Sequence, residues 1–130
     1  PAAGQVDEER AESYFDEAAK LCEREGGRLW GESLCGPMVF ADPVTGTIAT
    51  NQKPPDAPKP RVLGYANAAL EWGEERWSTF VWQMIPAEDA SARGRLMLHE
   101  LFHRIQPRIG LYIPAAKAAP SVNFVIIVSS

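Results

Sequence analysis

Two histidines four residues apart, with a glutamate between them, are the feature of this sequence that points to a chemistry. Residues 99–103 read His-Glu-Leu-Phe-His, and apolar residues surround them at helical spacing. Side chains four positions apart lie one above the other on an α-helix, so both imidazoles can reach one metal ion. Glu100 is placed to take a proton from a water in the metal's open position. The motif therefore predicts Zn²⁺ bound by His99 and His103, with Glu100 as the catalytic base.

The apolar residues around this motif predict which way its helix faces. On a helical wheel with His99 at the top, they share the far side, and these are Gly94, Leu98, Leu101, Phe102 and Ile105. We therefore expect the histidines and Glu100 to face a cleft or solvent. The competing interpretation is an amphipathic helix whose exposed face carries two histidines and a glutamate without any metal.

The segment from Arg95 to Ile105 resembles the active-site helix of the zincin metallopeptidases. In that family the two motif histidines bind zinc and the motif glutamate is the general base, which implies these roles for His99, His103 and Glu100. The resemblance further implies that a peptide or protein is the substrate and that water, deprotonated by Glu100, hydrolyses the peptide bond. The residue after the second histidine is normally uncharged in the family. Here it is Arg104, which we expect to one side of the site face.

A third zinc ligand is not evident, although a catalytic zinc has three protein ligands and one open position. The metzincin extension would need a glycine at Gln106 and a histidine at Ile109, so that subclass is excluded. Gluzincins and aspzincins take a downstream acid, but residues 104–130 contain no Asp, Glu, His or Cys. The chain thus resembles a gluzincin without its downstream ligand segment. The open alternatives are the terminal carboxylate, a second chain, no third ligand, or one of the upstream acids Asp42, Glu71, Glu74 and Glu88.

Composition predicts a single α+β domain over residues 1–130, with 108–130 the least certain part. The chain has 130 residues, of which 45% are hydrophobic, enough for one core. A net charge of −4 without any Lys/Arg-rich run argues against a nucleic-acid partner. No stretch approaches the roughly 20 apolar residues of a membrane span. The apolar run 122–128 would form an exposed strand edge able to self-associate.

The start of the chain and its two cysteines bear on localisation. Pro1 is not preceded by methionine, which predicts a secreted or periplasmic protein after removal of a signal peptide, although trimming by other means would look the same. In an exported protein Cys22 and Cys35 can form a disulfide, and in a cytosolic one they would be two buried thiols. Both interpretations stay open at this point.

Periodicity and turn residues predict the elements that must position the motif. We expect an N-terminal helix, a small antiparallel or mixed sheet built from hairpins, and the motif helix, in a zincin-like arrangement. The predicted ranges are a helix at 7–25 stopped by Gly26 and Gly27, a hairpin of 37–42 and 47–51 around Gly46, strands at 61–65, 68–72 and 76–84, and a helix from Pro86 in its first turn to about Ile105.

The strand before the motif helix carries a further expectation. In zincins the strand next to the active-site helix is usually an exposed edge that pairs with the substrate backbone, and Trp77–Met84 has the corresponding place in this sequence. Packing of its aromatic side chains in the core is the simpler interpretation. An alternative function also remains, in which a zincin-like domain is inactive or incomplete and serves as a binding or scaffold module.

Overall fold

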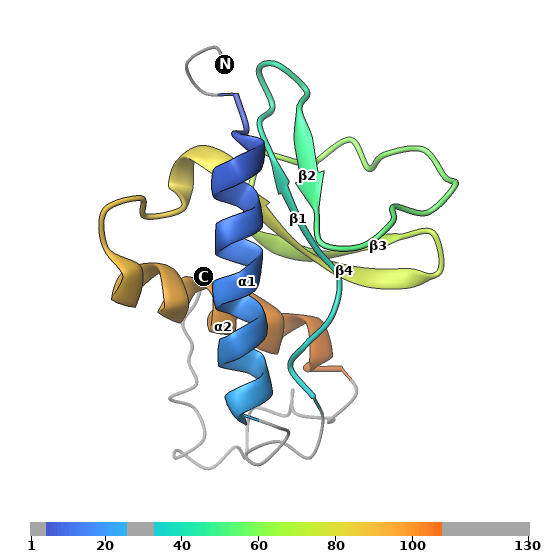
Figure 1. Cartoon of the computed structure of the whole chain (residues 1–130). Coiled ribbons are helices and arrows are strands. Elements are labelled where there is room, and N and C mark those ends of the chain that lie inside the picture. Colours follow the sequence, from blue (N-terminus) through green and yellow to red (C-terminus); the bar gives the residue numbers. More distant parts are fainter. Residues whose placement is uncertain (1–4, 26–32, 108–130) are drawn as a thin grey trace, which may run out of the picture.

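The structure, a computed structural model, describes residues 5–25 and 33–107 (Figure 1). Its elements in chain order are helix α1 (Glu8–Glu25), strands β1 (Met38–Ala41), β2 (Ile48–Thr50), β3 (Ala68–Trp72) and β4 (Glu75–Val81), the short 3-10 helix η1 (Trp82–Met84) and helix α2 (Ala90–Ile105). Two helices with a small mixed sheet confirm the predicted α+β class. The predicted self-associating strand at 122–128 lies outside the described residues. No helix within the described part is long and apolar enough to cross a membrane.

The sheet consists of two hairpins joined along a parallel pair of strands. Its order is β2-β1-β4-β3, with β1 antiparallel to β2, β4 antiparallel to β3, and β1 parallel to β4. Gly46 has a φ of 76° in the first hairpin turn and Gly73 a φ of 70° in the second. Such positive φ angles suit glycine, which has no Cβ to clash with the backbone. The hairpin predicted around Gly46 is thereby confirmed.

The position of β4 corrects the expectation of a substrate-binding edge. β4 pairs with β1 from Met38↔Ser78 to Ala41↔Val81, and its other side pairs with β3. Both rows of backbone hydrogen-bonding groups are therefore in use, so no substrate strand can be added to β4. Within the described sheet the outer strands are β2 and β3. The sequence pattern could not show this because the parallel partner of β4 lies far away in the chain.

Two predicted strand segments fold differently. Residues 61–65 form a turn, in which the Leu63 N–H donates to the Pro60 carbonyl and the Tyr65 N–H to the Val62 carbonyl. Gly64, with a φ of 87°, packs so closely on Pro43 that an added Cβ would clash, which is incompatible with the predicted strand. The end of the predicted 76–84 strand instead winds into η1, where the Ile85 N–H donates to the Trp82 carbonyl.

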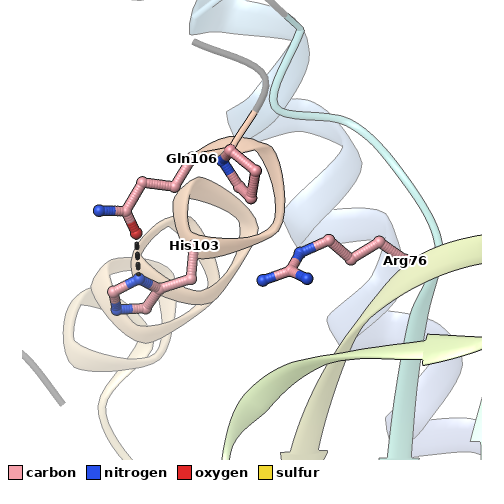
Figure 2. Close-up of a pocket in the computed structure, with 4 residues that line it drawn as sticks. Arg76, His103 and Gln106 are labelled. Carbon is pink, nitrogen blue, oxygen red and sulfur yellow. Dashed lines mark hydrogen bonds between the residues drawn. The ribbon is translucent and has the colours of Figure 1, made fainter. Parts of the chain in front are cut away.

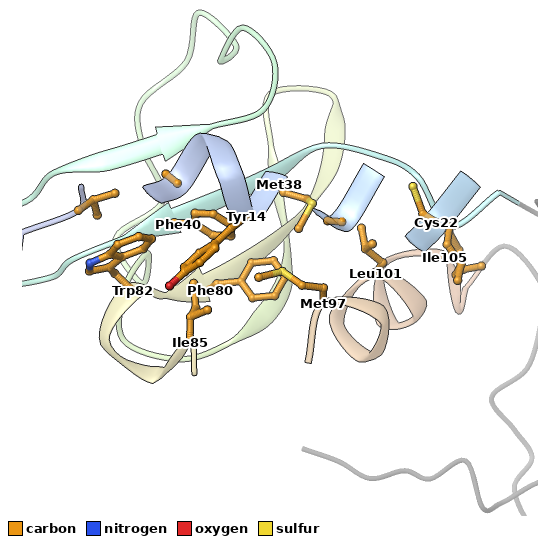
Figure 3. Close-up of a cluster of buried hydrophobic side chains, with 14 residues drawn as sticks. Tyr14, Cys22, Met38, Phe40, Phe80, Trp82, Ile85, Met97, Leu101 and Ile105 are labelled. Atoms are coloured by element: carbon orange, nitrogen blue, oxygen red, sulfur yellow. The ribbon is translucent and has the colours of Figure 1, made fainter. Parts of the chain in front are cut away.

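Alternation along β1 and β4 produces a core on each face of the sheet. Met38, Phe40 and Phe80 point towards the two helices and form the larger core with their apolar residues (Figure 3). There the Phe40 and Phe80 rings meet edge to face with centroids 5.4 Å apart. Val39 and Trp77 pack on the opposite face in a smaller cluster with residues of the 51–65 loop and β3. Core packing is therefore the role of Trp77 and Phe80, both fully buried.

Helix α2 begins later than its proline suggested. Asp89 is the N-cap, because its side chain accepts a hydrogen bond from the Ala92 N–H at 3.0 Å. Pro86 thus precedes the helix and does not occupy its first turn. The carbonyl groups of Pro86 and Ala87 accept from the Arg93 guanidinium at 2.9 and 3.2 Å, which holds the chain non-helical there.

Arg93 also joins the two helices. Its Nε and Nη2 atoms donate to the two carboxylate oxygens of Glu17 at 2.7 and 2.9 Å, and its guanidinium lies over the Tyr14 ring, 4.5 Å from the centroid. Arg93 itself is buried, and its charge can be accommodated there because the guanidinium makes two hydrogen bonds to a carboxylate. The hydrogen bond from Arg93 lowers the pKa of Glu17.

A disulfide fastens the last turn of α1 to the segment before β1. Cys22 and Cys35 are bonded to each other and are not free thiols, with Cα atoms 5.2 Å apart. The Cys35 carbonyl in turn accepts a hydrogen bond from Arg104 of α2 at 3.0 Å. The bridge therefore links α1 to the end of α2 that carries the motif.

We predict that replacement Glu17→Gln destabilises the protein by roughly 1–2 kcal/mol at neutral pH, because it leaves the buried Arg93 without its counter-charge. The figure is modest because the Glu17 side chain is 37% exposed and water screens the pair. Since pairing lowers the pKa of Glu17, its contribution is present above the unfolded-state pKa of about 4.3 and is lost as the pH falls through the folded-state value.

Urea unfolding of the wild type and the variant over a range of pH measures this difference. The two free energies of unfolding should converge on acidification, as protonated Glu17 comes to resemble glutamine. Glu12→Gln, an exposed position on the same helix, is the matched control and should change little at any pH. A Glu17→Gln difference that persists in acid would contradict the ion-pair explanation.

Candidate metal centre

The Nε2 atoms of the two motif histidines face each other at hydrogen-bonding distance. Their Nε2 atoms are 3.1 Å apart, and their rings are perpendicular with centroids 4.5 Å apart. Nitrogens bound to a tetrahedral zinc at about 2.0–2.1 Å would be about 3.3 Å from each other. Both side chains are half-buried on the last two turns of α2. The structure thus brings His99 and His103 together as the motif predicted, at a spacing that fits one zinc ion.

Gln106 orients one of these imidazoles, a role that sequence reasoning missed. His103 Nδ1 lies 2.9 Å from the Gln106 Oε1, which as a carbonyl oxygen can only accept, so Nδ1 carries the proton. The lone pair of neutral His103 is then on Nε2, the atom that faces His99. Second-shell acceptors of this kind fix the tautomer of metal-binding histidines. In the sequence, Gln106 could have been recognised as a side-chain amide three positions after His103. In the structure it is the C-cap of α2.

The second imidazole is fixed by the first. With the His103 Nε2 acting as an acceptor, the Nε2–H of His99 must donate across the 3.1 Å separation. Burial, and next the charge that His103 can carry, lower the pKa of His99. A neutral His99 is therefore favoured. With its proton on Nε2 its lone pair lies on Nδ1, so binding a metal through Nε2 requires the other tautomer.

Glu100 does not face outward, which corrects the prediction from the helical wheel. It is 4% exposed, and its backbone carbonyl accepts a hydrogen bond from the Ser78 hydroxyl of β4 at 3.2 Å. The Glu100 Oε1 atom is shielded from solvent and has no hydrogen-bond partner among the described residues. Burial raises the pKa of Glu100, partly opposed by the nearby His103. This carboxyl group is therefore easier to protonate than an exposed glutamate.

The wheel failed because charged residues lie on the buried face of α2. Arg93, Met97, Glu100 and Arg104 recur at spacings of three or four and are all buried, whereas Leu98 and Phe102 are only partly so. A wheel that counts only apolar residues as core therefore rotates the helix too far from its true orientation.

Arg104 also lies differently from the prediction, because it points into the interior and not to one side of the site face. It is buried, and its Nη2 donates to the Cys35 carbonyl at 3.0 Å. Its guanidinium occupies the space beside Gly36, where an added Cβ would stand 2.3 Å from the Arg104 Cζ. The charged residue that departs from the zincin pattern thus has a structural role next to the disulfide.

No third ligand reaches the histidines within the described residues, where no cluster of three His, Cys, Asp or Glu side chains could hold a metal. Asp42 is committed to the hairpin turn, where the Thr45 hydroxyl first, and Gln83 and backbone N–H groups further, lower its pKa. Glu71 pairs with Arg76 at 3.5 Å. Glu74 lies in the β3–β4 turn and Glu88 before α2. The terminal carboxylate, a further candidate from the sequence, falls outside the described part.

A pocket of about 400 Å³ opens beside the second histidine (Figure 2). It is lined by Arg76 of β4 and by His103, Gln106 and Pro107 at the end of α2. Its volume is within the range of small-ligand sites, which have a few hundred Å³. The pocket gives a ligand access to the imidazole whose orientation Gln106 fixes.

Comparison with known proteins does not assign this site, because the chain matches no family model, no curated protein and no solved structure. The chemistry must be inferred from the geometry. Two imidazoles whose Nε2 atoms lie 3.1 Å apart can bind one borderline-soft metal ion such as zinc once neither Nε2 carries a proton, and Glu100, the residue after His99, is a buried carboxyl group.

We predict opposite tautomers for the two histidines in the metal-free protein: Nδ1–H for His103 and Nε2–H for His99. Imidazole ¹⁵N chemical shifts of the neutral rings, recorded in mildly alkaline solution, distinguish these forms directly. Gln106→Leu removes the acceptor and should give His103 a mixture of tautomers, while Gln106→Glu keeps an acceptor and should preserve Nδ1–H. An unchanged His103 tautomer in Gln106→Leu would show that Gln106 does not orient the ring.

Proposed function

We propose that this protein is a zinc metallopeptidase of the zincin type, gluzincin-like, that hydrolyses peptide bonds. The carrying observation is the 3.1 Å separation of the His99 and His103 Nε2 atoms. Glu100 lies between them in the sequence, and burial raises the pKa of its carboxyl group, which the charge that His103 can carry lowers in part. The α+β fold with the motif on its last described helix supports the assignment but is too general to carry it. Peptides or proteins are the proposed substrates.

Each residue of the site has a role that follows from its contacts. Gln106 keeps the proton of His103 on Nδ1 and so leaves its Nε2 lone pair for a metal. Zinc binding by His99 through Nε2 would further require its proton to move to Nδ1, which breaks the hydrogen bond between the two rings. Zinc, when bound, would polarise the peptide carbonyl and make a water molecule easier to deprotonate. Glu100 is the proposed acceptor of the water's proton, which it would return to the leaving amine. Because its Oε1 atom is shielded from solvent, this role requires the side chain to turn towards the histidines.

A second candidate function is an inactive or incomplete zincin-like domain that acts as a binding or scaffold module. Two observations favour it: the described residues offer no third ligand, and β4 is paired on both sides. Two histidines alone would hold zinc much more weakly than three ligands. The two functions therefore differ first in zinc affinity and only then in turnover.

We further propose that the protein works in an oxidising compartment, secreted or periplasmic. The Cys22–Cys35 disulfide supports this, since such bonds persist mainly outside the reducing cytosol. A peptide substrate in that environment is consistent with the proposed activity.

We predict one tightly bound zinc per chain, cleavage of unstructured peptides, and a different defect in each of two variants. Glu100→Gln should keep zinc but lose roughly 10²–10⁴-fold or more in turnover, because no carboxylate remains to accept the proton. His99→Ala should lose both zinc and activity. Zinc is measured by competition with a chromophoric chelator, and turnover by chromatography of the peptide products.

Glu12→Gln, the same chemical change at an exposed site, is the control and should leave both quantities unchanged. Full turnover in Glu100→Gln would refute the assigned base. Weak zinc binding by the wild type, with no cleavage, would instead establish the scaffold alternative.

A further inference from the structure

Arg76 is a cation beside the histidine pair for which the proposed mechanism has no use. It lies on β4, and its side chain extends towards the last turn of α2, where it shares the 400 Å³ pocket with His103 and Gln106 (Figure 2). A cation on a neighbouring strand, opposite a proposed metal ligand, is placed to bind a part of the substrate that does not react.

Within the described residues, most hydrogen-bonding groups of Arg76 have no partner. A guanidinium has five N–H donors, and the one ion pair of Arg76 among the described residues joins its Nη1 to the Glu71 Oε2 at 3.5 Å, longer than a good hydrogen bond. The Nε atom is shielded from solvent and has no hydrogen-bond partner in the described part of the chain. This guanidinium therefore retains the capacity to bind an acceptor.

The existing ion pair is easily exchanged. Glu71 is the cross-strand neighbour of Arg76 in the β3–β4 register, and the two side chains are 67% and 35% exposed. Exposed pairs of this kind are worth little because water screens both charges. A carboxylate from a ligand in the pocket can therefore replace Glu71 without disturbing the sheet.

We propose that Arg76 anchors a carboxylate of the bound peptide and makes the site selective for substrates that carry one. The planar guanidinium matches a carboxylate with two parallel hydrogen bonds, which gives orientation as well as affinity. The carboxylate is either the peptide's own C-terminus or an Asp or Glu side chain near the cleaved bond. The inference deepens the proposed peptidase function and rests on it for the identity of the ligand.

The experiment compares three peptides with one apolar sequence and an acetylated N-terminus. The first ends in an amide, the second in a free carboxylate, and the third ends in an amide but has one residue replaced by aspartate. Calorimetric titration measures their binding to the full chain, with and without zinc, so that the readout does not depend on turnover. We expect at least one carboxylate peptide to bind about tenfold more tightly than the neutral peptide, and the tighter of the two identifies the source.

Matched variants assign this preference to Arg76. Arg76→Gln should abolish it, and Arg95→Gln, an exposed arginine on α2 that binds Ser91, should retain it. Glu71→Gln removes the competing carboxylate and should strengthen binding of the carboxylate peptide. Equal binding of all three peptides to the wild type, or a preference that survives Arg76→Gln, would overturn the proposal. Thermal unfolding of each variant confirms that it is folded.

Failure of this inference is distinct from failure of the proposed function. Zinc binding and Glu100-dependent cleavage without carboxylate preference would refute the role of Arg76 alone. Arg76-dependent peptide binding by a protein that does not hold zinc would refute the peptidase and leave a carboxylate-binding pocket.

Discussion

The orientation of α2 depends on the burial of one arginine. The guanidinium of Arg93 contacts the carboxylate of Glu17, the ring of Tyr14 and two carbonyl groups of the loop before the helix. A charge can stay in the interior only when its hydrogen bonds are made, so these contacts leave α2 little freedom to rotate. With Arg93 facing inward, helical geometry fixes the directions of the side chains one and a half to three turns later in α2. His99 and His103 come to lie at the partly exposed side and Glu100 against β4.

How much of the fold could be predicted from the sequence depends on whether local or distant contacts decide each element. Local signals worked where local chemistry decides: both helices, the Gly46 hairpin and β3 were located from periodicity and turn residues. The prediction was wrong where a distant residue decides. The Arg61–Tyr65 segment has strand-like composition, but the contact of Gly64 with Pro43 requires a turn. The place of β4 inside the sheet depends on β1, and no pattern within β4 reports that partner.

The site shows a similar division between local and distant causes. The pairing of His99 with His103 follows from a spacing of four on a helix and could be read from the sequence alone. The inward turn of Glu100 could not, because it requires knowing that Arg93 and Arg104 are buried. Gln106 could have been proposed from the sequence as an amide close to His103. Its contact with His103, however, depends on the helical backbone continuing to that residue. Arg76 is far from the motif in the sequence, and it lines the pocket beside His103 because it is on strand β4 of the sheet.

The parallel pairing of β1 with β4 has a consequence for the time course of folding. It joins residues about 40 positions apart in the sequence, such as Met38 and Ser78. Strands β2 and β3 lie between them in the chain. Closing so large a loop is slow compared with forming a helix or a hairpin. The surface against which Glu100 packs exists only after that closure, since Ser78 lies in the paired region. The histidine spacing needs only the local helix, whereas Glu100 acquires its buried environment only once the long-range pairing of β1 with β4 has formed.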